Sequence, residues 1–181
     1  MLGYVLLVYL LIYFAAAFVL PSYRVWKRTN VNPVTFRGAD TAHDYIGKLF
    51  KIVMASLTAV VATYAFAPDD YSFLLPIARL ENRTTQIVGI VLLVLSLGWT
   101  VLAQIQMGNS WRIGIDEEKE TALVRSGLFS LSRNPIFLGM IVTLTGFFLT
   151  IPNALMLLFL VLGFVTNKFF DSGLSNYSYL A

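Results

Sequence analysis

Residues 107–139 read MGNSWRIGIDEEKETALVRSGLFSLSRNPIFLG and form the longest polar segment of a mostly apolar chain. Near its end, Asn134 is a good helix N-cap and Pro135 a good first helical residue, so the sequence predicts a helix that begins there. The first N–H groups of a helix have no intrahelical partner and carry partial positive charge. Together with the adjacent Arg133, they form a place for a carboxylate or a phosphate group.

The rest of the chain is apolar enough to indicate a membrane protein. Hydrophobic residues make up 57% of the 181 residues and charged residues only 13%, whereas soluble domains are roughly 25% charged. We predict one all-α domain, a polytopic membrane helical bundle with about five transmembrane helices. The predicted spans are residues 2–20, 45–67, 84–105, 135–150 and 153–167, and residues 106–134 form the loop described above. The last two spans are slightly short and are predicted to form a helical hairpin.

Composition also limits the chemistry. The chain has no cysteine and a single histidine, His43, so a zinc or iron site built from several His and Cys ligands is excluded. Carboxylates alone can still hold a harder ion, but we read the acidic run at residues 116–120 as a solvated surface and predict no metal site. The basic residues lie in short loops beside apolar spans, which favours lipid headgroups over nucleic acid as partners.

Lysine and arginine counts predict the orientation. The polar loop expected at residues 22–44 and the loop at residues 106–134 are the richest in Lys and Arg. With five spans these loops share a side with the C-terminus, and the positive-inside rule puts that side in the cytoplasm and the N-terminus outside. The apolar patch at residues 73–77 is too short to cross and is read as interfacial. Gly139, Thr143 and Gly146 share a helix face, which we read as a close helix contact.

Three motifs carry a family resemblance. They are Gly108-Asn109-Ser110-Trp111, then Leu123-Val124-x-x-Gly127-x-Phe129, then Arg133-Asn134-Pro135-Ile136-Phe137-x-Gly139. Over about residues 84–166 this pattern resembles the isoprenylcysteine carboxyl methyltransferase and phospholipid methyltransferase family. Members are integral membrane enzymes that use S-adenosylmethionine, so the resemblance implies that cofactor here.

The resemblance also implies which residues form the cofactor site. The segment at Thr121, Ala122, Leu123 and Val124 would wrap the cofactor with its backbone. Phe129 would pack nearby, Gln104 would supply a polar group from the preceding span, and Asn134, Pro135, Ile136 and Phe137 would complete the pocket. Arg133 is our candidate catalytic residue, because the methionine carboxylate of the cofactor suits this arginine and the helix start beside it.

The chain departs from the family pattern in two places. The family usually has His at position 134 and Tyr at positions 129 and 137. It also carries a pair of glutamates after the last span, whereas here no glutamate follows Glu120 and Asp171 is the only acid in the tail.

The predicted function is therefore transfer of a methyl group to an amphiphilic acceptor, with an isoprenylcysteine-like carboxylate as the first choice. A carboxylate nucleophile needs no general base, so positioning and a water-poor site suffice. The altered tail favours an alternative, a non-enzymatic or inactive membrane member of the family. A third reading is a membrane sterol or lipid reductase that uses NADPH. The identity of the acceptor and the oligomeric state are left open.

Overall fold

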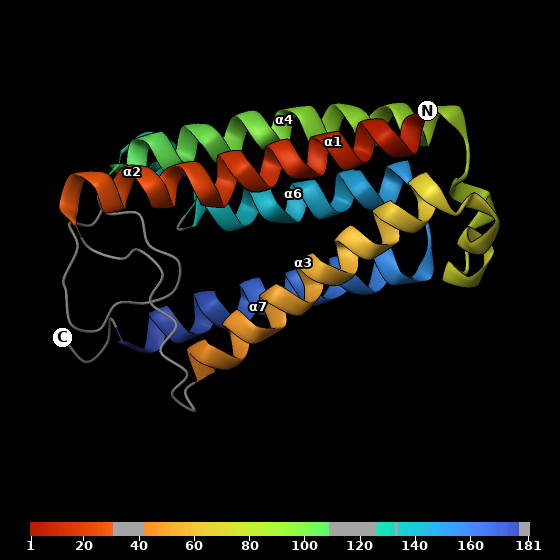
Figure 1. The fold of residues 1–181 in the computed structure, drawn as a ribbon. Coiled ribbons are helices and arrows are strands. Elements are labelled where there is room, and N and C mark those ends of the chain that lie inside the picture. Colours follow the sequence, from red (N-terminus) through yellow and green to blue (C-terminus); the bar gives the residue numbers. More distant parts are fainter. Residues whose placement is uncertain (31–41, 109–125, 133, 178–181) are drawn as a thin grey trace.

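The structure is a computed structural model that describes residues 1–30, 42–108, 126–132 and 134–177 (Figure 1). Every regular element in these ranges is helical, apart from an isolated bridge between Pro76 and Asn153. The elements are α1 (Leu2–Phe14), the π-helical turn η1 (Ala15–Val19), α2 (Leu20–Thr29), α3 (Ala42–Phe66), the 3-10 helices η2 (Pro68–Leu74) and η3 (Ala78–Leu80), α4 (Arg83–Met107), α5 (Leu128–Leu131), α6 (Pro135–Thr150) and α7 (Ala154–Tyr177). The all-α prediction is confirmed for the described residues.

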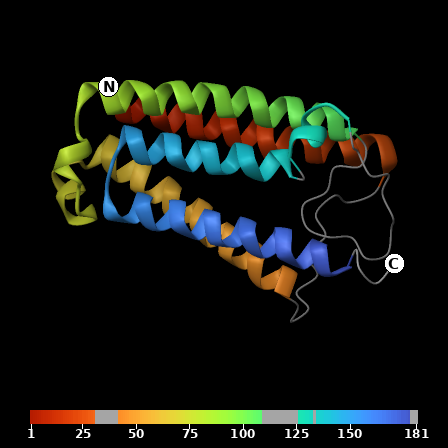
Figure 2. The same ribbon diagram turned by 180° about the vertical axis from the view of Figure 1, so that it is seen from behind.

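The long helices run back and forth along one axis. The α1–η1–α2 rod, α4 and α6 lie side by side, and α3 and α7 pair along the other side of the bundle (Figures 1 and 2). The most extensive helix contact is that between α4 and α6, and α3 contacts both α1 and α7. As a result α2, the end of α4 and the start of α6 meet at one end of the bundle (Figure 1). We call this the α6-start end.

Two helices are long and apolar enough to cross a bilayer, Leu2–Thr29 and Arg83–Met107. Shorter apolar helices occupy Lys51–Phe66, Pro135–Thr150 and Ala154–Thr166. Large apolar side chains such as Val94 and Leu95 on α4 are exposed, at 63% and 62%, as expected of a surface that faces lipid tails. A membrane helical bundle is therefore supported, and five crossings stay a prediction.

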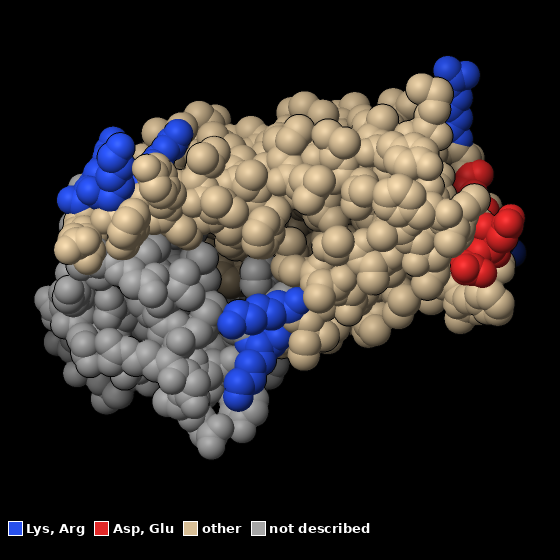
Figure 3. Space-filling view, viewed as in Figure 1, with Lys and Arg blue, Asp and Glu red and all other residues tan. Residues whose placement is uncertain are grey.

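The charged side chains lie toward the ends of the bundle. Among the described side chains, the α6-start end carries Arg24, Lys27 and Arg28 on α2 and Lys48 and Lys51 on α3. The opposite end carries Asp69, Asp70, Arg79, Glu81 and Arg83. In the view of Figure 3, acidic atoms lie at the end of the bundle away from the α6-start end, and basic atoms lie toward both ends.

The first helix is longer than the sequence predicts. A span ending at residue 20 and a polar loop over residues 22–44 were expected, but the rod continues through α2 to Thr29. Pro21 lies in the first turn of α2, where proline is tolerated, and the wide π-helical turn η1 comes directly before it. Val25 is buried while Arg24 and Arg28 are exposed, so the polar residues belong to one face of an amphipathic helix. Asn30, in the left-handed conformation at φ 53°, ends it.

Two further bounds differ from expectation. The polar loop expected over residues 106–134 contains the short helix α5, Leu128–Leu131. The last helix runs on from its apolar part to Tyr177, whereas the span was expected to end near residue 167. Helix α5 is short and the added part of α7 is largely polar, so hydropathy did not predict either of them.

Glycines bring α4 and α6 into close contact, as predicted. A Cβ atom on Gly146 would lie 2.8 Å from Leu93 Cγ, and one on Gly89 would lie 2.7 Å from the carbonyl oxygen of Gly146. Thr143, on the same face, donates to Ser96 Oγ across the contact at 2.9 Å. The predicted packing role of Gly139, Thr143 and Gly146 is confirmed, because side chains any larger would force the helices apart.

The hairpin turn between α6 and α7 is closed by the segment after η2. Asn153 is fully buried, its Oδ1 accepts from Met156 N at 3.0 Å, and its Nδ2 donates to the Ile151 carbonyl at 3.0 Å. Ile77 N donates to the Pro152 carbonyl at 2.9 Å, and Ala154 N to the Leu75 carbonyl at 3.2 Å. The apolar patch over residues 73–77 therefore packs on the turn at the end of the bundle.

Candidate functional site

The start of α6 has the local structure that the sequence predicts. Asn134 is the N-cap, its side chain accepts from Phe137 N at 3.1 Å, and Pro135 is at the first helical position. The backbone N–H of Asn134 donates to Ser132 Oγ at 3.3 Å. Ser132 and residues 134–137 are thus linked by short-range bonds that need no distant partner.

The cap also limits what the helix start can bind. Pro135 has no N–H, Phe137 N is engaged by the cap, and Leu138 N donates to the Asn134 carbonyl at 3.1 Å. Within the described residues, the N–H of Ile136 is the one donor of this first turn with no recorded acceptor. One free backbone donor is fewer than an uncapped helix start would offer.

Two side chains of α4 hold the neighbouring segments in place. Trp99 Nε1 donates to the Pro135 carbonyl at 2.8 Å, and Gln106 Oε1 accepts from Leu128 N, the first residue of α5, at 2.8 Å. Gly127 precedes α5 with φ 63°, and a Cβ there would lie 2.6 Å from Gln106 Oε1. Neither Trp99 nor Gln106 was predicted. In the sequence they appear only as an indole and a polar residue toward the end of an apolar span, which is a weak indication of a role in the site.

Gln104 is buried, and its amide makes a long-range bond. Its Nε2 donates to the carbonyl of Ala17, which is fully buried in the π-helical turn η1. Because a buried polar group without a partner is costly, Gln104 has a structural role that links α4 to the α1–η1–α2 rod.

The predicted site residues divide into two groups. Arg133 and the segment Thr121, Ala122, Leu123 and Val124 lie outside the described residues. Gln104 is at the end of α4, Phe129 is half-buried in α5, and Pro135 is buried at the start of α6. Asn134, Ile136 and Phe137 are half-buried beside it. The fold thus brings the described members to one end of the bundle.

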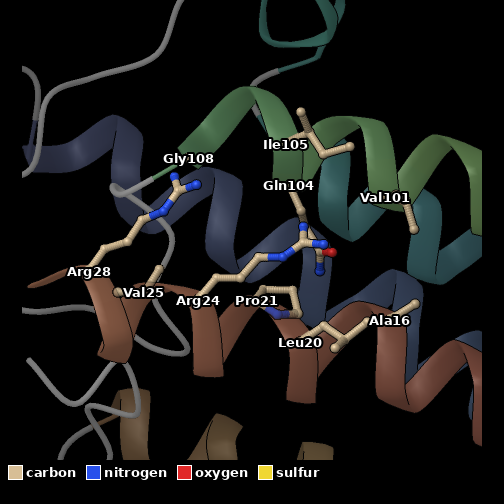
Figure 4. A pocket seen from close by; sticks show the side chains of 10 residues that line it. All are labelled: Ala16, Leu20, Pro21, Arg24, Val25, Arg28, Val101, Gln104, Ile105 and Gly108. Carbon is tan, nitrogen blue, oxygen red and sulfur yellow. The ribbon is translucent and has the colours of Figure 1, made fainter. Parts of the chain in front are cut away.

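A cavity of about 220 Å³ opens between α2 and the end of α4 at this same end. Figure 4 shows Arg24 and Arg28 reaching from α2 toward α4, Arg24 toward Gln104 and Arg28 toward Gly108. The cavity is lined by Ala16, Leu20, Pro21, Arg24, Val25, Arg28, Val101, Gln104, Ile105 and Gly108. Of the predicted site residues, Gln104 alone is among them. The two arginines were missed because residues 22–44 were read as a loop, although their spacing of four was visible.

A second cavity, of about 430 Å³, lies at the opposite end. Its lining includes Tyr71, Glu81 and Arg83. Burial raises the pKa of Tyr71, so its hydroxyl remains protonated and can donate to the Pro152 carbonyl 3.4 Å away. Within the described ranges, no three His, Cys, Asp or Glu residues gather closely enough to hold a metal ion.

Comparison with known proteins gives one match. Residues 84–172 match the family model described as phospholipid methyltransferase. The matched range starts at α4 and runs through α5 and α6 into α7. No curated protein and no solved structure matches the chain.

Proposed function

Because residues 84–172 match the family model of phospholipid methyltransferases, we propose that the chain is a member of this family and transfers a methyl group from S-adenosylmethionine to an amphiphilic acceptor. The observation that carries the proposal is the matched range itself. It contains the end of α4, α5 and the capped start of α6, and every residue predicted for the cofactor site belongs to it. Methyltransferase and membrane character follow from the family, and the cofactor and the acceptor are our proposals.

The chemistry around the start of α6 supports such a cofactor. The free N–H of Ile136 and the positive end of the α6 dipole suit the methionine carboxylate, and we assign Arg133 to the same carboxylate. The half-buried rings of Phe129 and Phe137 suit adenine or a sulfonium centre. The cofactor supplies an activated methyl group, so these residues have only to bind, orient and exclude water.

The proposed acceptor is a carboxylate on a prenylated or similar apolar tail. A carboxylate attacks without a general base, which suits a chain that has one histidine and no cysteine. The apolar tail would approach from the bilayer, along exposed side chains such as Ile105, at 60% exposure.

Isothermal titration of the detergent-solubilised protein with S-adenosylmethionine tests the cofactor. We expect binding in the wild type, retained binding in Asn134→Ser, and binding several-fold weaker in Asn134→Asp. Both replacements keep a good N-cap, but the aspartate puts a negative charge where we propose the cofactor carboxylate. Equal affinities in the two variants would mean that the cofactor carboxylate does not bind at this helix start.

A methyl-transfer assay tests the acceptor, with prenylated thioether acids compared with aminophospholipids. Methylation of the acids supports the proposed acceptor. Cofactor binding without transfer to either class indicates an inactive family member. Binding of NADPH instead of S-adenosylmethionine indicates the reductase.

A further inference from the structure

Two arginines of α2 face the cavity beside α4 and have no described carboxylate near them. Arg24 and Arg28 are four residues apart, one helical turn, so they share a face. Their side chains extend from α2 toward the end of α4 (Figure 4). The carboxylates whose side chains the structure describes, Asp69, Asp70 and Glu81, belong to the opposite end of the bundle. Two guanidinium groups that line one cavity are a favourable arrangement for an oxyanion.

The cavity joins a basic part to an apolar part. Beside the arginines its lining is aliphatic, with Leu20 on α2 and Val101 and Ile105 on α4. Leu20 and Ile105 are 47% and 60% exposed, so the aliphatic part opens outward. The volume of about 220 Å³ is below the roughly 300–1,000 Å³ of pockets for drug-sized ligands. A small anionic group with an apolar continuation fits these walls better than a whole nucleotide.

The neighbouring aromatic residues indicate the depth of the cavity. Tyr23 and Trp26 flank Arg24 on α2 and are 52% and 53% exposed, and exposed Tyr and Trp mark the headgroup level of a bilayer. Leu20 is one turn away, which corresponds to roughly 6 Å along the helix axis toward the apolar part. The arginines thus lie at phosphate depth and the aliphatic lining at the depth of the first acyl carbons.

We propose that this cavity binds a phosphate group, held by the guanidinium groups of Arg24 and Arg28. When the phosphate belongs to an anionic phospholipid, the aliphatic lining contacts the glycerol and the first acyl carbons. The same two arginines can hold free phosphate, without using that lining. The proposed phosphate-binding groups, Arg24 and Arg28, lie on α2 outside the matched range 84–172, whereas the α4 side of the cavity lies within it. Neither arginine is among the residues proposed for methyl transfer.

The test is calorimetric titration of the full chain in a nonionic maltoside detergent, with three probes. They are dihexanoyl phosphatidylglycerol, dihexanoyl phosphatidylcholine and inorganic phosphate. We expect phosphatidylglycerol to bind more tightly than phosphatidylcholine. In the double variant R24A/R28A its affinity should fall about tenfold or more, because charge-assisted hydrogen bonds are the stronger class. Inorganic phosphate that binds as tightly as phosphatidylglycerol would assign the site to the free ion.

Lys27→Ala is the matched control. Lys27 lies on the same helix and carries the same charge, but it stands over the Tyr23 ring, 5.9 Å from the centroid, and does not line the cavity. We expect this variant to lose less than about twofold in affinity, because the nonionic detergent carries no surface charge and an exposed charge that makes no direct contact is screened by salt. An equal loss in Lys27→Ala and in each single arginine variant would overturn the proposal, as would unchanged binding in R24A/R28A.

A second double variant keeps the test decisive if R24A/R28A does not fold. R24K/R28K retains both charges but loses the planar fork of the guanidinium. We expect it to bind phosphatidylglycerol several-fold more weakly than the wild type. Wild-type affinity in R24K/R28K would mean that charge alone acts there, and the proposed site would be wrong. S-adenosylmethionine binding is measured on the same variants and is expected to be unchanged.

Discussion

At the scale of single residues, the bond between Gln104 and Ala17 connects α4 to the first helical rod. The amide of Gln104 donates to the carbonyl of Ala17, in the π-helical turn η1. Ala17 is fully buried and Gln104 is only 7% exposed, so the bond is largely shielded from solvent. The glutamine that family resemblance assigns to the cofactor is therefore also a structural link between η1 and α4.

Replacing Gln104 should destabilise the protein. We expect Gln104→Leu to lower the free energy of unfolding by about 1–3 kcal/mol, the usual cost of a buried polar group left unpaired.

Thermal unfolding in detergent measures this loss, and cofactor affinity is measured separately on the same variant. An unchanged free energy of unfolding would show that the bond to Ala17 does not stabilise the fold.

At this scale the sequence predicts the role of some site residues and not of others. The cap at Asn134 and the proline after it depend on neighbours in the chain, so their pattern is readable. Arg24 and Arg28 look like ordinary loop residues until α2 is known to be a helix. Gln104 and Ala17 are 87 residues apart, and no local pattern connects them.

At the scale of elements, α4 and α6 form the contact that positions the site. The two helices approach through Gly89 and Gly146 and are joined by the Thr143–Ser96 bond. Tyr9 of α1 adds its hydroxyl to this cluster, donating to the Leu93 carbonyl at 2.6 Å. Where lipid surrounds the helices, such close packing and buried hydrogen bonds replace the hydrophobic effect as the source of association.

We expect Gly146→Ala to destabilise this contact by about 1–3 kcal/mol, the typical cost of overpacking a well-packed interior. A Cβ there would meet Leu93 Cγ at 2.8 Å, so one of the helices has to shift. Thermal unfolding in detergent provides the measurement.

Gly98→Ala is the matched control for that substitution. Gly98 is also in a long helix, but a Cβ at this position meets no atom within 4 Å. It should be neutral or stabilising by up to about 1 kcal/mol, because alanine favours the helix. Similar losses at both glycines would attribute the effect to something other than the α4–α6 contact.

At the scale of the whole molecule, the charges indicate an orientation in the membrane. Of the Lys and Arg side chains that the structure describes, five lie toward the α6-start end and two at the opposite end. With the positive-inside rule this supports our prediction that the α6-start end faces the cytoplasm. The proposed cofactor site and the proposed phosphate site would then both face the cytoplasmic leaflet.

Single cysteines can test this orientation directly, because the chain contains none. We expect Asp70→Cys to react with a membrane-impermeant maleimide in intact cells, and Lys27→Cys to react only after the membrane is opened. Both positions are exposed side chains at helix ends or in η2, so either can be labelled in detergent as the control. The reverse pattern would invert the predicted topology, and labelling of both in intact cells would mean that they share a side.

The sequence by itself determined the helical class, the positions of the apolar helices and the capped start of α6. These features follow from composition, periodicity and neighbouring residues, which a linear chain displays. Only the tertiary structure decided that the rod continues through Pro21, that Gln104 supplies the donor for the Ala17 carbonyl, and that Arg24 and Arg28 meet a cavity beside α4. The reason is physical, since each depends on which helix faces which, and that is set by side-chain packing between segments far apart in the chain.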